Sequence, residues 1–292
     1  MSSRNGMRNL GNTCYLNVAI QCLLSLSCLP VLLMNVQQPH PPAIKFLMES
    51  LRTHTSIVLS PNAVYDTYLT LYDNKRHMPE DAVECFLRLT QYIEDNMIQR
   101  IQATPPPQTI SCACDLFWKN QKDLTLLKEY FYGVLYSRMT CTNCNRTTTK
   151  FETFQVLPIH STVTNSVSDG LIHLTNHSER IDSVECEGCK DKNTFTIDQT
   201  FHRLPKVLMF EIVGRSTTFC FDEMLVIQHT HGNKNENITY RLKTLFLYNG
   251  SHYHCVAYDA LVQKYAWIDD ERVTLVGLNL NDSLRLLVYE AV

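Results

Sequence analysis

The order of hydrophobic and polar positions divides the chain into a helical first part and a β-rich second part. From Cys14 to about Gln102, apolar residues recur mostly at helical spacing. Three consecutive prolines within the segment Ala103 to Gln108 predict a rigid linker or an extended loop. Short β-rich runs follow, over residues 130–139, 151–159, 194–200, 207–213, 225–228, 240–247, 253–258 and 284–289. Helices followed by strands predict an α+β fold, without the alternation of a βαβ protein.

The composition is that of a globular protein with a sizeable core. Of the 292 residues, 45% are hydrophobic and 19% are charged, and the net charge is −3. This small negative charge predicts no attraction to nucleic acid or to an anionic membrane. No apolar run approaches the roughly 18 residues of a membrane-spanning helix, and the polar segment Met1 to Asn9 does not resemble a signal peptide. We expect a monomer that binds neither nucleic acid nor membrane.

Twelve cysteines in a chain without a signal peptide predict a reducing intracellular compartment, the cytoplasm, the nucleus or both. In such a compartment thiols serve catalysis, metal binding or core packing. Five cysteines are given specific roles below. The other seven are interpreted as small hydrophobic residues: Cys22, Cys28, Cys85, Cys112, Cys114, Cys220 and Cys255.

Cys14 lies at the predicted start of a helix, after a turn rich in Asn and Gly. Asn12 and Thr13 are both good N-cap residues. A thiol at a helix N-terminus is biased toward the thiolate, the form that attacks carbonyl groups. A nucleophile of this kind needs a histidine partner, and the histidine needs a group that fixes its tautomer. The residues alone leave two interpretations of Cys14 open, a nucleophile and a buried core cysteine.

Two Cys-x-x-Cys pairs predict a structural zinc site. Cys141 and Cys144 form the first pair, and Cys186 and Cys189 form the second after 41 intervening residues, 145 to 185. Two such turns can supply four thiolates to one tetrahedral zinc ion. The separation exceeds the range of a short zinc ribbon, so a β-hairpin excursion must connect the pairs. Four unrelated thiols, or a redox pair, are the less favoured alternatives.

The run Gly6 to Asn17 resembles the cysteine box of the ubiquitin-specific proteases, Gly-Leu-x-Asn-Leu-Gly-Asn-Thr-Cys-Tyr-x-Asn. Met7 replaces the Leu of that box, and the Gln that follows it in the family is Gln21. Further segments resemble the family in the expected order: 77–87, 131–137, 204–208, 240–258, 267–274 and 284–289. The resemblance therefore covers nearly the whole chain. The family's Leu-Lys-Arg-Phe after the strand at 207–213 is missing.

The resemblance implies a single catalytic domain over residues 1–292 with a papain-like fold. A helical thumb would occupy about 6–110, zinc-stapled β fingers about 130–215, and a β-sheet palm with the histidine and aspartate boxes about 216–292. In the family the zinc holds together the fingers, which grip the globular body of ubiquitin. The segment 250–252 lacks the residues that form a loop over the ubiquitin tail in many relatives, which implies a less closed tail channel.

The resemblance also implies roles for individual residues. Cys14 would be the nucleophile, and Asn9 would supply its amide to the oxyanion. His252 keeps the family's His-Tyr pair and is favoured as the base, although His254 fits a competing register. Positions two apart share one face of a strand, so the pattern leaves both histidines open. Asp269 would orient the base. Asp270 is the alternative to Asp269 as the residue that orients the base. The resemblance also implies that Asp81 and Glu84 bind the substrate by facing the arginines of the ubiquitin tail.

We therefore predict a thiol-dependent deubiquitinase that hydrolyses the isopeptide or peptide bond after the C-terminal Gly of ubiquitin. Its partners would be ubiquitin or ubiquitinated proteins, and its cofactor a structural zinc ion. Two alternatives stay open at this point. One is a protease for another ubiquitin-like modifier, and the other is an inactive scaffold that binds ubiquitin without cleaving it.

Overall fold

The computed structural model describes residues 2–98, 113–121, 124–176, 179–214, 216, 218–231, 234–278 and 282–292. The proline segment 103–108, predicted to be a linker or loop, and Cys112, predicted to be a small hydrophobic residue, lie outside these ranges. Among the described residues, no helix is both long and apolar enough to cross a membrane.

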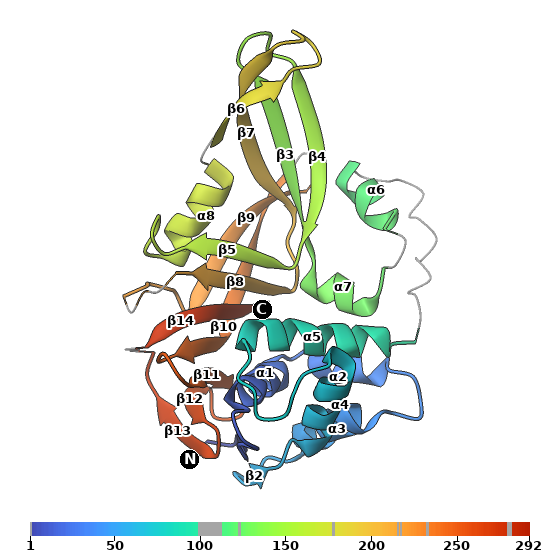
Figure 1. Ribbon diagram of the computed structural model, residues 1–292, viewed down its shortest axis with the longest axis vertical. Coiled ribbons are helices and arrows are strands. Elements are labelled where there is room, and N and C mark those ends of the chain that lie inside the picture. Colours follow the sequence, from blue (N-terminus) through green and yellow to red (C-terminus); the bar gives the residue numbers. More distant parts are fainter. Residues whose placement is uncertain are drawn as a thin grey trace.

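Five helices form the thumb: α1 (Cys14–Ser25), α2 (Leu29–Met34), α3 (Pro42–Arg52), α4 (Asn62–Tyr72) and α5 (Ala82–Asp95). Helix α1 is central, and all of its residues except Leu24 are buried. Such a helix is apolar around most of its circumference because neighbours cover it on every side. It packs against α5 and against the sheet strand β11 (Tyr253–Asp259), so the helix lies where thumb and sheet meet (Figure 1).

An eight-stranded sheet forms the palm. Its strand order is β13-β12-β11-β10-β14-β8-β5, and β9 pairs with β10 off this path. The pairing is antiparallel except between β5 and β8. The remaining strand bounds are β5 (Val156–His160), β8 (Val207–Val213), β9 (Met224–His231), β10 (Lys234–Tyr248), β12 (Lys264–Asp269), β13 (Arg272–Val276) and β14 (Ser283–Ala291). One face of the sheet packs on the thumb in the first core cluster, and the other face forms a second core.

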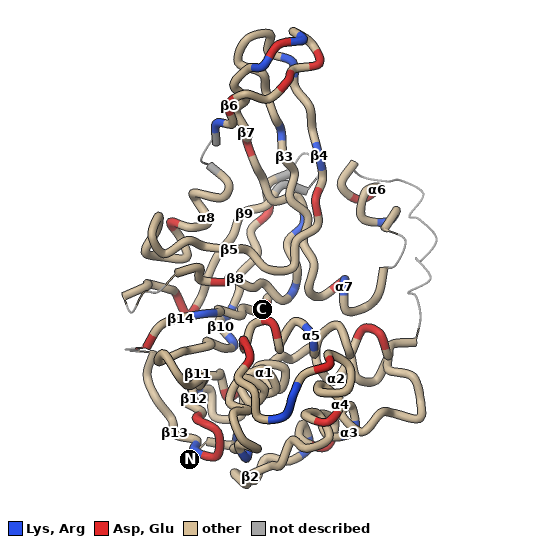
Figure 2. Tube along the Cα trace, viewed as in Figure 1, with Lys and Arg blue, Asp and Glu red and all other residues tan. Residues whose placement is uncertain are grey.

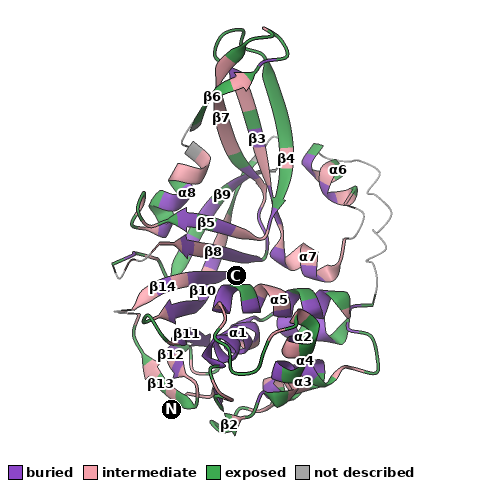
Figure 3. Ribbon diagram, viewed as in Figure 1, coloured by how far each residue is buried: buried purple, intermediate pink, exposed green. Residues whose placement is uncertain are grey.

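A four-stranded sheet forms the fingers, which extend away from the thumb (Figure 1). Its order is β4-β3-β7-β6, formed by β3 (Gly133–Cys141), β4 (Thr147–Phe154), β6 (Glu179–Glu185) and β7 (Lys192–Arg203). Seven of the eight residues of β4 are not buried, and Figure 3 shows that β4 and the tip of the fingers are mostly exposed while much of β7 is intermediate. Charged residues of both signs gather at their tip (Figure 2). The fingers therefore have little apolar core of their own.

Three further helices flank the sheets: α6 (Ala113–Lys119), α7 (Leu126–Phe131) and α8 (Val167–Asn176). A short parallel pair, β1 (Gly6–Met7) and β2 (Val58–Leu59), ties the N-terminal segment to the thumb. The predicted strand at 207–213 has the bounds of β8, whereas β6, β12, β13 and α8 had no counterpart in the predicted elements. The division into thumb, fingers and palm at the predicted residue bounds stays a prediction. Two strands inside the predicted finger range 130–215, β5 and β8, belong to the eight-stranded sheet of the palm.

Candidate active site

Cys14 is the first residue of α1 and is nearly buried, with 9% of its surface exposed. Thr13 occupies the N-cap position but makes no side-chain cap bond, because its hydroxyl accepts the N–H of Leu10 at 2.8 Å. Asn12 has a positive φ of 54° and donates its side-chain amide to the carbonyl of His77. Neither predicted cap therefore closes the helix terminus, and the N–H groups of Cys14 and Tyr15 face the sulfur instead.

The expected bias of Cys14 toward the thiolate is wrong for the free protein. Burial raises the pKa of its thiol above the ordinary value because a thiolate loses solvation in this position. A hydrogen bond from the N–H of Tyr253 acts against this effect, and the nearby charge of Asp270 adds to it. The helix N-terminus does not compensate for the burial. The thiol is consequently protonated at neutral pH and needs a base to become a nucleophile.

His252 lies beside a carboxylate that can orient it as that base. Its Nε2 lies 2.6 Å from Oδ1 of Asp269, at the end of β12. With Nε2 bound to this carboxylate, Nδ1 is the ring nitrogen left for a proton from the thiol. The side chain of Asn249 accepts the backbone N–H of His252 and shapes the turn. The backbone N–H of Tyr253 contacts the thiol of Cys14. His252 is the residue directly before Tyr253 in the sequence, so this contact holds its backbone near the thiol.

His254 is held elsewhere. It is buried within β11, its Nε2 lies 3.0 Å from a carboxylate oxygen of Asp282, and its ring packs against Trp267. Burial lowers its pKa because the imidazolium would lose solvation. His252 precedes β11, which begins at Tyr253, so the expectation that both histidines share one face of a strand is wrong. The structure brings His252 to Asp269, while the catalytic role itself stays a prediction.

Asp270 anchors the segment that precedes Cys14. Its two carboxylate oxygens accept the side-chain amides of Asn9 at 2.8 Å and Asn17 at 2.7 Å, and its backbone carbonyl accepts the N–H of Met7. Its Oδ2 is 3.9 Å from Nε2 of His252, farther than the carboxylate of Asp269. The amide of Asn9, predicted to bind the oxyanion, thus has one of its two hydrogens committed to Asp270 and is held in place by it.

The two acids predicted to face a substrate tail lie at the start of α5. Asp81 is its N-cap, and one carboxylate oxygen accepts the N–H groups of Val83 and Glu84. Its other oxygen accepts the hydroxyl of Tyr253 at 3.0 Å and lies 3.5 Å from a guanidinium nitrogen of Arg285. Their contact with a substrate stays a prediction.

The four paired cysteines meet at the tip of the fingers. The sulfur atoms of Cys141 and Cys189 are 3.9 Å apart, those of Cys144 and Cys186 are 3.6 Å apart, and all four lie within 4.8 Å of one another. A tetrahedral ion with metal–sulfur bonds of about 2.3 Å requires sulfur–sulfur edges of about 3.8 Å. Backbone N–H groups of Cys189 and Gly188 lower the pKa of Cys186 to about 7. The donor set and its spacing fit a metal ion with four thiolate ligands.

A sequence model of one family, described as ubiquitin carboxyl-terminal hydrolase, matches residues 5–289. The chain belongs to the ubiquitin carboxyl-terminal hydrolase family. Its similarity to individual members is low: it is 26% identical to ubiquitin carboxyl-terminal hydrolase 36 of Drosophila melanogaster over 88% of its own length, and 24% identical to ubiquitin carboxyl-terminal hydrolase 17-like protein E of Mus musculus over 97%. It spans 26% of the fly protein and 54% of the mouse protein.

A solved structure resembles this ubiquitin carboxyl-terminal hydrolase domain over its whole length. It is the SAGA Ubp8/Sgf11/Sus1/Sgf73 DUB module bound to ubiquitin aldehyde, with a TM-score of 0.71 and 16% identity, and the match covers 70% of that chain. At this identity the likeness concerns the fold alone, and it confirms the predicted α+β, papain-like class.

Three residues of this candidate site received no role from the sequence. Asn17 supports Asp270, Tyr253 touches both the thiol and Asp81, and Arg285 pairs with Asp81. A signal existed for Asn17, a polar residue inside the otherwise apolar helix, and for Arg285, a single charge inside an apolar strand. Only the fold could show what these residues contact.

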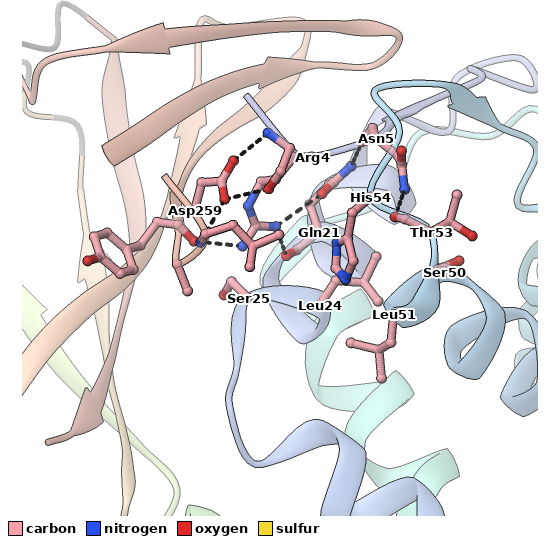
Figure 4. A pocket seen from close by; sticks show the side chains of 14 residues that line it. Arg4, Asn5, Gln21, Leu24, Ser25, Ser50, Leu51, Thr53, His54 and Asp259 are labelled. Atoms are coloured by element: carbon pink, nitrogen blue, oxygen red, sulfur yellow. Dashed lines mark hydrogen bonds between the residues drawn. The ribbon is translucent and has the colours of Figure 1, made fainter. Parts of the chain in front are cut away.

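A separate cavity of about 120 Å³ lies at the other end of α1 (Figure 4). Arg4 crosses it, donating to the carbonyl of Tyr258 at 2.8 Å and to Gln21. Asp259 accepts the hydroxyl groups of two serines from the N-terminal segment, Ser2 and Ser3. These bonds fasten the segment that leads to Cys14 onto the end of β11.

Proposed function

We propose that this chain is a thiol-dependent deubiquitinase that hydrolyses the isopeptide or peptide bond after the C-terminal Gly of ubiquitin. Family membership supports the class of reaction. The observation that carries the proposal is the contact between His252 and Asp269 at 2.6 Å, beside a buried thiol at the start of a helix. Ubiquitin or ubiquitinated proteins would be the partners.

The reaction would begin with proton transfer from the thiol of Cys14 to Nδ1 of His252, with Asp269 stabilising the imidazolium through Nε2. The thiolate then attacks the carbonyl carbon of the terminal Gly, and its oxygen becomes an oxyanion. The amide of Asn9 and the N–H groups of the first turn of α1 are the donors available to that oxygen.

Collapse of this tetrahedral state breaks the C–N bond, and His252 gives its proton to the leaving lysine amine. A thioester between the Gly carbonyl and Cys14 remains. His252 then takes a proton from water, the hydroxide attacks the thioester, and the thiol is released with the free carboxylate of ubiquitin. The raised pKa of Cys14 makes the histidine essential, because the thiol has little thiolate of its own at neutral pH.

We also propose that the ion held by the finger cysteines is zinc. Four thiolates are the ligand set of structural zinc sites, and Cys141, Cys144, Cys186 and Cys189 would fill all four positions. Such an ion takes no part in hydrolysis. It would supply the stability that the thin finger sheet lacks and keep its strands aligned for contact with a protein substrate.

The proposal is tested by hydrolysis of ubiquitin carrying a C-terminal fluorogenic amide. The wild-type protein should release the fluorophore, and Asp269→Asn should lower kcat by about 10⁴-fold, the loss that follows when a triad histidine has the wrong tautomer. Asp66→Asn, at an exposed carboxylate paired with Arg76 on the thumb surface, is the matched control and should retain activity. Hydrolysis by Asp269→Asn at the wild-type rate, or none by the wild-type protein, would refute the proposal.

A further inference from the structure

The acidic side chains at the start of α5 are already paired with arginines of the chain itself. Oδ2 of Asp81 lies 3.5 Å from a guanidinium nitrogen of Arg285, and Glu84 forms an ion pair with Arg88 one helical turn away. These are the two acids that would meet cationic residues of a substrate tail. Within the protein, the positive charge near Asp81 therefore comes from strand β14.

The backbone of β14 directs Arg285 to this position. On the neighbouring strand β10, Phe246 pairs with Leu286 and Leu247 pairs with Leu284, so Arg285 has no partner and forms a bulge. A bulge changes the direction of a side chain at the edge of a site. Its Nε is buried and has no hydrogen-bond partner among the described residues, while the side chain as a whole is 26% exposed. The guanidinium thus lies near Asp81 and is still accessible.

This pair lies next to the reacting atoms. The hydroxyl of Tyr253 donates to the same oxygen of Asp81 at 3.0 Å, and the backbone N–H of Tyr253 contacts the thiol of Cys14. Tyr253 therefore links the two places, because its backbone contacts the thiol of Cys14 and its side-chain hydroxyl reaches the pair of Asp81 and Arg285. An extended peptide advances about 3.3 Å per residue, so a tail that acylates Cys14 and runs toward the start of α5 would bring residues two to four before the scissile bond past this pair.

We propose that Arg285 is a specificity-determining residue that disfavours an arginine in the substrate tail and admits a neutral or acidic side chain at the position facing Asp81. An incoming arginine would meet a carboxylate that is already neutralised, together with a fixed like charge. The inference rests on the proposed function, because it concerns the tail that enters the same active site.

The test uses two fluorogenic ubiquitins, one with its native tail and one with the tail arginines replaced by alanine. The measured quantity is the ratio of kcat/KM for the native tail to kcat/KM for the alanine tail. Arg285→Gln should raise this ratio by about threefold to fivefold, the range of a partly exposed ion pair. Arg285→Met, which also removes the charge, should do the same, and Arg285→Lys should leave the ratio within twofold of wild type.

Arg138→Gln is the matched control, because Arg138 is an exposed finger arginine paired with Asp198. It should leave the ratio unchanged. The inference is overturned if both substrates are hydrolysed and neither Arg285→Gln nor Arg285→Met changes the ratio, or if Arg138→Gln changes it equally. Absence of hydrolysis by every variant and by the wild-type protein would instead refute the proposed function, and the inference with it.

Discussion

Replacing His252 with alanine removes the imidazole that Asp269 holds at 2.6 Å, and we expect the variant to lose nearly all turnover. The buried thiol of Cys14 would then have no base, and its raised pKa leaves little thiolate at neutral pH. Loss of one member of a triad that acts as a unit costs about 10⁴–10⁶-fold in kcat. At about 1.36 kcal/mol per decade this corresponds to roughly 5–8 kcal/mol of activation free energy.

His254→Ala is the matched control, because it makes the same substitution two residues along the chain. Its imidazole is buried against Trp267, so its loss should lower the free energy of unfolding by about 1–3 kcal/mol. Asp282, the partner that remains, is 39% exposed at its side chain and can be solvated by water. Turnover should fall by less than about tenfold, because the contact between His252 and Asp269 does not depend on this ring.

Both variants should be assayed with fluorogenic ubiquitin under single-turnover conditions, alongside thermal unfolding. The expected pattern is a folded, inactive His252→Ala protein and a less stable, active His254→Ala protein. A folded His254→Ala protein without activity, beside a His252→Ala protein that still turns over, would refute the assignment of the base. It would mean that Asp282, rather than Asp269, orients the catalytic histidine.

Three further outcomes follow from the structure. Cys186→Ser should lower the bound zinc, measured by elemental analysis, from one ion per chain to well below one. A metal-free wild-type protein that still binds ubiquitin normally would contradict the proposal that zinc stabilises the fingers. Asp270→Asn replaces one of the two carboxylate oxygens that accept Asn9 and Asn17 with an NH2 group and removes a charge near the thiol. It should cost about 1–3 kcal/mol of stability and lower the pH midpoint of Cys14 alkylation, and an unchanged midpoint would exclude the charge effect. The pKa of His254 is lowered by burial, so the unfolded chain binds its proton more readily, and the free energy of unfolding should fall as pH drops below about 6.5. Denaturant titrations of the wild-type protein and His254→Gln should show this slope in the former only.

Local patterns were sufficient to predict the helix at Cys14, the strand at 207–213 and the two cysteine pairs. Helical spacing and Cys-x-x-Cys turns are short-range features, and each depends on few neighbours. The edge strand β13 and the helix α8 were not predicted, because edge strands and half-buried helices have weaker apolar periodicity. The domain boundaries also depended on long-range pairing, since β5 joins the palm only through β8.

The site illustrates the same limit. The cysteine and histidine boxes indicated which residue types react, but not how protonated the thiol would be. Burial of Cys14 outweighs its helix terminus, and burial is a property of the packed thumb and palm. The choice between His252 and His254 likewise needed the turn at Asn249, which places the first histidine before the strand. The pairing of Arg285 with Asp81 depends on a bulge that no residue pattern announced.

The central claim is that Cys14 is the nucleophile of a ubiquitin-directed hydrolase. Its most direct test is incubation with ubiquitin propargylamide followed by intact-mass measurement and peptide mapping. We predict one covalent adduct per chain, located at Cys14, absent from Cys14→Ala and formed normally by Cys22→Ala, a variant of a buried cysteine on the same helix. No adduct with the wild-type protein, or an adduct that persists in Cys14→Ala, would contradict the account.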